Sequence, residues 1–454
     1  MPGNSVSALP TGRLSRMFKL GRMTTGIAAT ALGHSVKQLG RGESPGAAAL
    51  LNPANAERIA NELAQMRGAV MKLGQLLSME AGDILPRELT ELLARLRDSA
   101  HSMPPTQLRQ VLVEAWGERW QDLFQSFDEQ PFAAASIGQV HEAIDRSGRR
   151  LAIKVQYPGV AASIDSDLDN VATLLKLFRL LPPGLDIDRL LQIARVQLHE
   201  ETDYELEASH LRQYRARLEG DDLFRVPEVL ERLSGPGILA MSFIEGESIE
   251  RLSAARPELR DRMATRLIDL CLDEFLHWGI VQSDPNFANF LYNANDETIG
   301  LLDFGALLVN APGRNRSLAR LLRAALRQDL GELVAAACEV GYIEASDPFN
   351  YRMAVVDLLQ SAAEPALNPG RYDFAGSQLT QCISDKLLHL RNNHDTQRIP
   401  PADVIFLHRK LAGIFLLCAR IKARVDVRGI LLEHLERELD HRGGRHNLAL
   451  SPGD

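Results

Sequence analysis

The chain has 454 residues, 45% of them hydrophobic and 24% charged, which is typical of a globular protein with enough chain for two or three domains or one bilobal domain. Its net charge is −8, and the acidic balance beyond the first 42 residues argues against nucleic acid as a partner. The four cysteines lie far apart without a C-x-x-C pair. This spacing speaks against a zinc site and a disulfide framework and favours a reducing compartment.

Residues 1–45 are predicted to form a basic, amphipathic and flexible N-terminus. Up to residue 42 the segment carries six basic side chains and no acidic one, and Leu14, Met17, Phe18 and Leu20 recur among them near helical spacing. Such a segment can lie on an anionic membrane surface. An organellar transit peptide has a similar composition, and a disordered basic tail is a third interpretation.

Residues 46–130 are predicted to form a helical extension. A linker rich in Gly, Pro and Ser precedes a helix over about 57–79, a second helix is expected in "PRELTELLARL", and a third in "PTQLRQVLVEAWG".

A small strand-rich lobe is expected over residues 131–245. A turn at Ser147-Gly148 between "FAAASIGQVHEAID" and "RRLAIKVQ" predicts a β-hairpin. The stretches "ASIDSDLDNVATLLKLFRLL" and "DIDRLLQIARVQLHEETDYELEASHLRQYRARL" have helical patterns, and "FRVPEVL" and "GILAMSFIEG" are predicted to be short strands.

Residues 246–440 are expected to form a large helical lobe that has one small hairpin, "ANFLYNANDETIGLLDFG", and ends in a flexible tail over 441–454. No stretch reaches the ~18 uninterrupted apolar residues of a membrane-spanning helix. The most apolar one, "VIFLHRKLAGIFLLCARIKA", is broken by His408, Arg409 and Lys410. The predicted fold class is therefore α+β, with a helical extension, a small strand-rich lobe and a large helical lobe.

Four pieces of sequence follow one another in the order of a protein-kinase ATP site. The first is the strand "LAIK", whose Lys154 can hold α/β-phosphates once an acid positions it, although an edge-strand lysine would look the same. The second is the acidic run "EETDYELEAS". On one continuous helix, Glu207 would partner Lys154 while Glu201 points about 120° away toward another base. A solvated acidic face is the plain alternative.

The third piece is "QSDPNFANF", in which Asp284 and Asn289 have the spacing of the kinase H-R-D-x-x-x-x-N loop. In that loop the Asp takes or orients the proton of the attacking hydroxyl and the Asn binds magnesium. Gln282 and Ser283 stand where the motif has His and Arg. The fourth piece is "LLDFG", whose Asp303 would ligate magnesium at the phosphates. The four pieces together predict a bilobal, protein-kinase-like fold with a site for ATP, or ADP, and Mg²⁺.

Two further stretches complete the predicted nucleotide site. "LAMSFIEG" would be the hinge between the lobes, with Met241 at the back wall of the pocket and backbone groups of Ser242 and Ile244 reading adenine. The loop over the phosphates would consist of Ala133, Ala134, Ala135 and Ser136. Alanine in place of glycine predicts a stiffer loop, altered nucleotide selectivity and poor phosphoryl transfer to protein, with ATP binding retained.

These residues resemble the UbiB family of atypical kinases, also called aarF-domain kinases, over roughly residues 50–430. The family replaces the Gly-rich loop with an alanine-rich one, here "AAASIGQVH". It has a K-x-G-Q motif in an N-terminal helical extension, here Lys72, Gly74 and Gln75, and an E-x-D motif facing the lysine, here Glu201 and Asp203. The loop "QSDPNFAN" is closer to the "Q-T-D-P-N" of the branch that includes the mitochondrial coenzyme Q biosynthesis kinase than to the "H-x-D-P-H-P-G-N" of many bacterial members.

The resemblance implies an ATPase-like atypical kinase that supports ubiquinone biosynthesis at a membrane surface. The K-x-G-Q helix would cover the site of a peptide substrate, with Lys72 paired to the E-x-D acids and Gln75 directed at the nucleotide. The implied partners are anionic membrane lipids, isoprenoid quinone precursors and ubiquinone biosynthesis proteins, and a homodimer stays open. The implied location is peripheral, on the cytoplasmic side of the inner membrane in a bacterium or on the matrix side in a mitochondrion. Two alternatives remain: a phosphotransferase acting on a small molecule or protein, and a nucleotide-gated scaffold without turnover.

Overall fold

The computed structural model describes residues 66, 68–70, 72–74, 103–177, 187–284, 286–393, 398 and 400–446. The chain divides into two compact units. Unit 1 runs to Arg217 and takes in Pro227–Phe243, and unit 2 comprises Leu218–Val226 and the chain from Ile244 onward. The N-terminal segment and the first two expected helices lie outside the described residues, except for helical stretches at 68–70 and 72–74.

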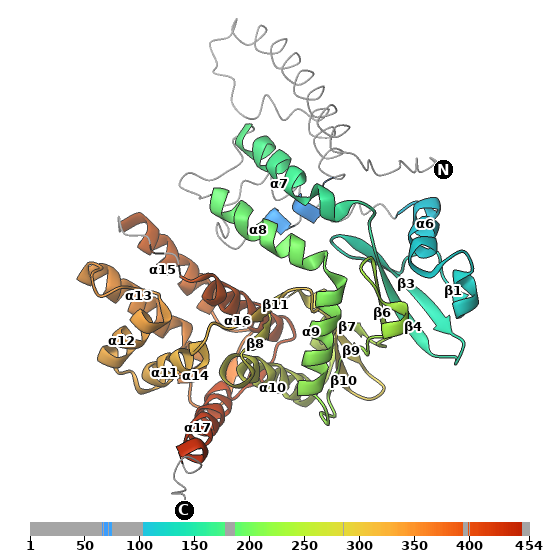
Figure 1. Cartoon of the computed structure of the whole chain (residues 1–454). Helices are drawn as coiled ribbons and strands as arrows, with labels where there is room; N and C mark the ends of the chain where they lie inside the picture. The colour runs from blue at the N-terminus through green and yellow to red at the C-terminus, as the bar shows by residue number, and fades with distance from the viewer. Residues whose placement is uncertain are drawn as a thin grey trace, which may run out of the picture. The chain divides into compact units, whose positions relative to one another are not determined.

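Unit 1 is built on an antiparallel sheet with the strand order β1-β3-β4-β6 (Figure 1). The short strand β2 pairs with the first residues of β3. The strands are β1 Phe124–Phe127, β2 Ala133–Ala134, β3 Gly138–Asp145, β4 Arg150–Gln156 and β6 Ile238–Ser242. β3 and β4 form the predicted hairpin. Gly148 occupies a left-handed conformation in its turn, with a φ of +87°, which a residue with a side chain enters only at a cost.

The side chains of strand β4 alternate between the hydrophobic core and the face of the sheet that carries Lys154. Leu151, Ile153 and Val155 are fully buried and pack in one cluster with Leu108 and Leu112 of α6 (Pro105–Trp116). Burying each such side chain contributes roughly 1.5–3 kcal/mol. Ala152, Lys154 and Gln156 alternate with them and are half-buried on the opposite face, because successive side chains of a strand point to opposite sides.

The helices of unit 1 depart from the sequence prediction at one point. They are α7 Val160–Leu177, α8 Ile187–Glu201 and α9 Tyr204–Arg217, with 3₁₀ turns at Trp120–Leu123 and Glu231–Leu233. The continuous helix expected through the acidic run is wrong, because α8 ends at Glu201 and the Asp203 side chain caps α9 by accepting from the Leu206 N–H at 2.9 Å. Glu201 and Glu207 therefore lie on different helices.

Unit 2 is mostly helical. Its helices are α10 Pro257–Asp273, α11 Arg314–Arg327, α12 Leu330–Val340, α13 Phe349–Ala362, α14 Glu364–Leu367, α15 Leu379–Asn393, α16 Ala402–Arg420 and α17 Val427–His446, with 3₁₀ turns η5 Ile249–Ala254 and η7 Phe287–Asn289 and a π-helical turn η6 Glu274–Trp278 (Figure 1). Among the described residues, no helix has both the length and the apolar character that crossing a membrane requires.

The predicted hairpin of unit 2 is present, as β9 Phe290–Asn293 and β10 Thr298–Leu301, within the sheet β5-β10-β9-β7 that includes β5 Phe224–Arg225 and β7 Glu247–Ser248. The expectation that it is the one strand pair after Arg256 is wrong. Two more pairs form, from β8 Ile280–Gln282 with β11 Leu307–Val309 and from β12 Tyr372–Asp373 with β13 Arg424–Val425. Strands of two or three residues are too short to leave an alternating pattern in the sequence.

Candidate active site

Lys154 and Glu207 form a buried ion pair in unit 1. The Lys154 Nζ lies 2.8 Å from both carboxylate oxygens of Glu207, whose side chain is 1% exposed. The Tyr204 ring adds a cation–π contact, with its centroid 5.1 Å from the same Nζ. A carboxylate as deeply buried as that of Glu207 requires a partner. The ion pair predicted from the sequence is therefore present, and it holds the Lys154 ammonium in a defined position.

Gly138, at the start of β3, lets the backbone approach this pair closely. A Cβ at position 138 would lie 2.4 Å from the Val155 carbonyl oxygen and 2.8 Å from the Tyr204 Oη. Any side chain here would push apart β4 and the first turn of α9, the two elements that carry Lys154 and Glu207.

Glu201 joins the K-x-G-Q lysine to the alanine-rich loop. Its Oε1 accepts from the Lys72 Nζ at 2.6 Å and its Oε2 accepts from the Ser136 hydroxyl at 2.9 Å. Lys72 is 5% exposed at its side chain and Gly74 is also buried. The contact between Lys72 and the E-x-D motif is thus made through Glu201, whereas Asp203 serves as a helix cap. Gln75 lies outside the described residues.

The alanine-rich loop is partly strand. Ala133 and Ala134 pair with Val140 and Gln139 of β3. The N–H of Ala135 donates to the Gly138 carbonyl at 2.9 Å. The loop is therefore closed by its own backbone bonds on one side and by the Ser136 hydroxyl on the other.

The residues of the predicted hinge fall on both sides of the boundary between the units. Met241 is buried and pairs with Ala152 of β4. The Ser242 N–H donates to the Glu228 carbonyl at 2.8 Å, so this N–H is engaged within unit 1. Ile244 belongs to unit 2, where it packs against Gly300 of β10. The adenine-reading role of these residues stays a prediction.

In unit 2, Asp284 and Asn289 are brought together by one short turn. η7 begins after Asn286, whose side chain accepts from the Ala288 N–H. The turn directs the Asn289 Nδ2 to the Asp284 Oδ2, at 2.9 Å. Because an amide has one donor and one acceptor end, this bond uses the donor end and leaves the side-chain Oδ1 of Asn289 as the atom that could bind a metal ion.

Asp303 follows β10 and lies in a loop that is bonded to the loop of Asn289. Its Oδ1 accepts from the Gly305 N–H at 2.9 Å. The Leu302 N–H donates to the Asn289 carbonyl at 3.0 Å. Carboxylate and amide oxygens are the hard ligands that Mg²⁺ prefers, so the donor set of Asn289 and Asp303 fits the expected ion.

Gln282, which stands in the position of the motif histidine, links both loops. Its Nε2 donates to the backbone carbonyls of Asp284 at 2.9 Å and Asp303 at 3.1 Å. Its Oε1 accepts from the Lys410 Nζ at 3.0 Å. One buried amide thus sets the relative position of the candidate base and the candidate metal ligand.

Lys410 and Glu274 form a second buried ion pair behind Gln282. Their side chains are 2% and 0% exposed, and the Lys410 Nζ lies 3.1 Å from the Glu274 Oε2. Glu274 opens the π-helical turn that follows α10, and its Oε1 accepts from the Gln282 N–H at 2.9 Å. π-Helical turns of this kind are frequent at functional sites.

Arg409, the neighbour of Lys410 on α16, pairs with Asp284. Its Nη2 donates to the Asp284 Oδ1 at 2.8 Å, and the two side chains are 8% and 19% exposed. Ser283, in the position of the motif arginine, instead donates its hydroxyl to the Ala306 carbonyl. Arg409, Lys410 and Glu274 were not among the site residues predicted from the sequence. The available signal was the occurrence of charges inside an apolar helix, since buried charges are paired.

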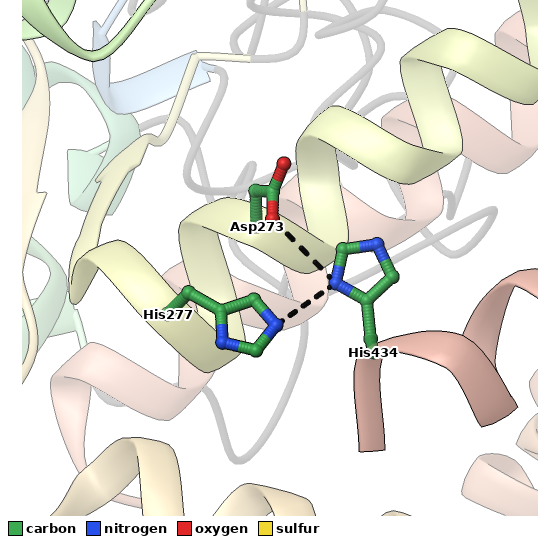
Figure 2. Close-up of side chains that lie close together, drawn as sticks. All are labelled: Asp273, His277 and His434. Atoms are coloured by element: carbon green, nitrogen blue, oxygen red, sulfur yellow. Dashed lines mark hydrogen bonds and ion pairs between the residues drawn. The ribbon is translucent and has the colours of Figure 1, made fainter. Parts of the chain in front are cut away.

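A separate cluster of titratable side chains joins α17 to α10 and η6. The donor atoms of Asp273, His277 and His434 lie within 4.8 Å of one another, a spacing that a metal ion could bridge (Figure 2). The groups already bond to protein, however. The His434 Nδ1 lies 3.1 Å from the His277 Nε2, the His434 Nε2 lies 2.8 Å from Asp269, and the Arg437 guanidinium lies 3.4 Å from Asp273. The His434 bond lowers the pKa of Asp269, and burial raises that of Asp273. The Arg437 guanidinium thus already supplies a cation to this cluster, and we interpret the cluster as a packing contact of α17 with α10 and η6.

Comparison with known proteins places these features in context. A family model described as ABC1 atypical kinase-like domain matches residues 95–337. Over 422 residues the chain is 38% identical to the atypical kinase COQ8, mitochondrial, of Saccharomyces cerevisiae, a match that covers 92% of this chain and 84% of that protein. Over 432 residues it is 35% identical to the atypical kinase COQ8B, mitochondrial, of Rattus norvegicus, covering 94% and 81%. The solved structure of Rv3197 with erythromycin, from Mycobacterium tuberculosis, matches with a TM-score of 0.57 and 26% identity, over 82% of this chain and 95% of that one.

Proposed function

Because the chain belongs to the ABC1, or UbiB, family of atypical kinases, we propose that it binds Mg-ATP and hydrolyses it in support of coenzyme Q biosynthesis at a membrane surface. The family resemblance and the kinase-like α+β fold predicted from the sequence are confirmed. The binding of ATP and Mg²⁺, the hydrolysis of ATP and the attachment to a membrane are our proposals beyond the family and the fold.

The observation that carries the proposal is that, within each unit, the residues predicted to act in phosphoryl transfer are held by specific contacts. In unit 1, Lys154 is positioned by Glu207 as a phosphate-binding lysine must be. In unit 2, Asp284 and Asn289 are hydrogen-bonded, and Gln282 ties the Asp284 and Asp303 backbones together. A scaffold without turnover would have no need for all of these contacts.

Asp284 is proposed to orient the attacking water. Its Oδ2 is held by Asn289 and its Oδ1 by Arg409. Each carboxylate oxygen has a second lone pair, so the held carboxylate can still accept a hydrogen bond from the nucleophile. Bound Mg²⁺ would neutralise charge on the β- and γ-phosphates, and Asn289 and Asp303 are the residues that would hold it.

Hydrolysis is favoured over protein phosphorylation by the way the alanine-rich loop is held. Lys72 and Ser136 share the carboxylate of Glu201, which fixes the loop to the K-x-G-Q segment. A loop held on both sides and poor in glycine adapts less readily to a second, bulky substrate. The family resemblance assigns the same segment to covering the peptide site.

The membrane part of the proposal rests on the basic N-terminus and on the relatives. Residues 1–42 have no acid and six bases, which suits an anionic surface, and the COQ8 relatives from yeast and rat are described as mitochondrial. We propose peripheral attachment, with anionic lipids, isoprenoid quinone precursors and ubiquinone biosynthesis proteins as partners. The side would be cytoplasmic at a bacterial inner membrane or the matrix side in a mitochondrion.

Phosphate release from Mg-ATP tests the proposal. The purified chain is assayed with and without anionic liposomes, beside the Asp303→Asn variant and the matched control Asp296→Asn, whose carboxylate contacts Thr298 within the β9–β10 hairpin. We expect release that lipid stimulates, that disappears in Asp303→Asn and that persists in Asp296→Asn. If the wild type releases no more than Asp303→Asn while it still binds nucleotide, hydrolysis is refuted, and a transferase or a nucleotide-gated scaffold becomes the better explanation.

A further inference from the structure

The two terminal nitrogens of the Arg409 guanidinium differ in their hydrogen bonding. The Nη2 bonds to the Asp284 Oδ1 at 2.8 Å. The Nη1 is buried and has no hydrogen-bond partner. Leaving a buried donor unpaired is unfavourable, and more so for a charged group, so an unpaired donor beside the candidate catalytic carboxylate requires an explanation.

The other cations of α16 show that Arg409 is distinctive. Lys410 is fully committed to Glu274 and Gln282. Arg420 pairs with Glu250 at the surface, with its side chain 68% exposed. Arg409 combines burial, contact with Asp284 and an unused donor, and these are the properties of a group that completes its bonding when substrate arrives.

We propose that the Nη1 of Arg409 donates to an oxygen of the phosphoryl group transferred from ATP, so that one guanidinium holds Asp284 and stabilises the reacting phosphate. The inference rests on the proposed function. Asp284 marks the place where the water oxygen meets the γ-phosphorus, and one guanidinium carries both Nη atoms, so the Nη1 lies within a few ångströms of the Asp284 carboxylate.

The chemistry of the two groups fits this role. In phosphoryl transfer, negative charge is spread over the three equatorial oxygens of the phosphoryl group. A guanidinium stays protonated and presents its donors in a planar fork that matches such oxygens. In the step, the bond from the γ-phosphorus to the bridging oxygen breaks and ADP leaves with that oxygen, while the bond to the water oxygen forms and the proton of the water passes to the product phosphate. Arg409 keeps its protons and transfers none.

The test separates charge from fork geometry. Arg409→Lys retains a cation that can reach Asp284, but a single ammonium does not present the second donor in the same plane. We expect turnover to fall about 10²-fold, by analogy with the loss of one oxyanion donor, while Mg-ATP affinity and Tm stay near wild type. Arg409→Ala should lose turnover as well and regain part of it with added guanidinium ion. Arg420→Lys is the matched control on the same helix and should behave as wild type.

The outcomes are distinguishable. If the wild type turns over ATP and Arg409→Lys does so at the same rate, this inference is wrong and the proposed function stands. If Arg409→Lys loses nucleotide affinity and Tm together with turnover and guanidinium does not restore Arg409→Ala, Arg409 has only a structural role and the inference is overturned. If wild-type release does not exceed that of Asp303→Asn, the proposed function fails and this inference with it.

Discussion

Replacing Lys410 with Met should destabilise the protein through the charge that it leaves behind. Lys410 and Glu274 are 2% and 0% exposed, and their charged atoms lie 3.1 Å apart. Removing one partner of a buried ion pair costs roughly 3–5 kcal/mol, because the remaining ion is buried without compensation. At roughly 2–4 °C per kcal/mol for a unit of 150–250 residues, Tm should fall on the order of 10 °C.

The second substitution shows whether the cause is the orphaned carboxylate. Glu274→Gln removes the charge and keeps an oxygen that can accept the Gln282 N–H, as the Glu274 Oε1 does at 2.9 Å. The double variant Lys410→Met/Glu274→Gln should therefore recover most of the lost stability, since a buried pair replaced as a whole is often neutral.

Thermal and denaturant unfolding of the single and double variants form a double-mutant cycle. Arg420→Met is the control, because it breaks an exposed pair with Glu250 and should cost at most about 1 kcal/mol. The reasoning is refuted if Lys410→Met loses no more stability than Arg420→Met, or if the double variant loses the sum of both single losses.

Three further predictions concern unit 1. Burial lowers the pKa of His141, whose Nε2 faces the Gln139 amide nitrogen at 2.9 Å. As the pH falls, His141 is therefore protonated first in the unfolded chain, near pH 6.5, and the free energy of unfolding should decrease below that pH. Urea midpoints measured above and below about pH 6.5 should show this decrease in the wild type and not in His141→Gln. The exposed-site control His199→Gln should keep the decrease. Lys72→Glu places like charges at a 2.6 Å contact and should cost roughly 3 kcal/mol; the exchanged pair with Glu201→Lys should recover most of this loss in thermal unfolding, and an equal loss in both would contradict the contact. Ala134→Gly should strengthen Mg-ATP binding or autophosphorylation by loosening the loop, and unchanged nucleotide titrations and phosphorylation would show that the loop is not the limit.

The features that sequence predicted well are the ones encoded over short distances. The hairpin around Gly148 needs a glycine in its turn, and the five-residue spacing from Asp284 to Asn289 is closed by one 3₁₀ turn. Strand alternation placed Lys154 on the face opposite the β4 core. In each case the physical cause lies within a few residues of its effect.

The features that sequence missed depend on tertiary contacts. The acidic run has helical propensity on both sides of Asp203, and the break appears because that side chain caps the next helix at Leu206. Arg409 reaches Asp284 from 125 positions away. Periodicity identified its helix as apolar but could not show which loop would supply the partners of its charges.

The position of these charges shows how this chain departs from the kinase H-R-D-x-x-x-x-N loop. The motif His and Arg are replaced by Gln282 and Ser283, and the loop segment they occupy carries no cation of its own. α16 supplies two instead: Arg409 contacts Asp284 directly, and Lys410 orients the Gln282 amide that bridges the two Asp loops. The two cations lie on a helix and not on a loop, and Glu274 of the π-helical turn fixes the charge of Lys410. They therefore have less freedom to move away from the Asp284 loop. Such an arrangement fixes the candidate base relative to the candidate metal ligand, which would suit the proposed hydrolysis more than a loop that must be switched on.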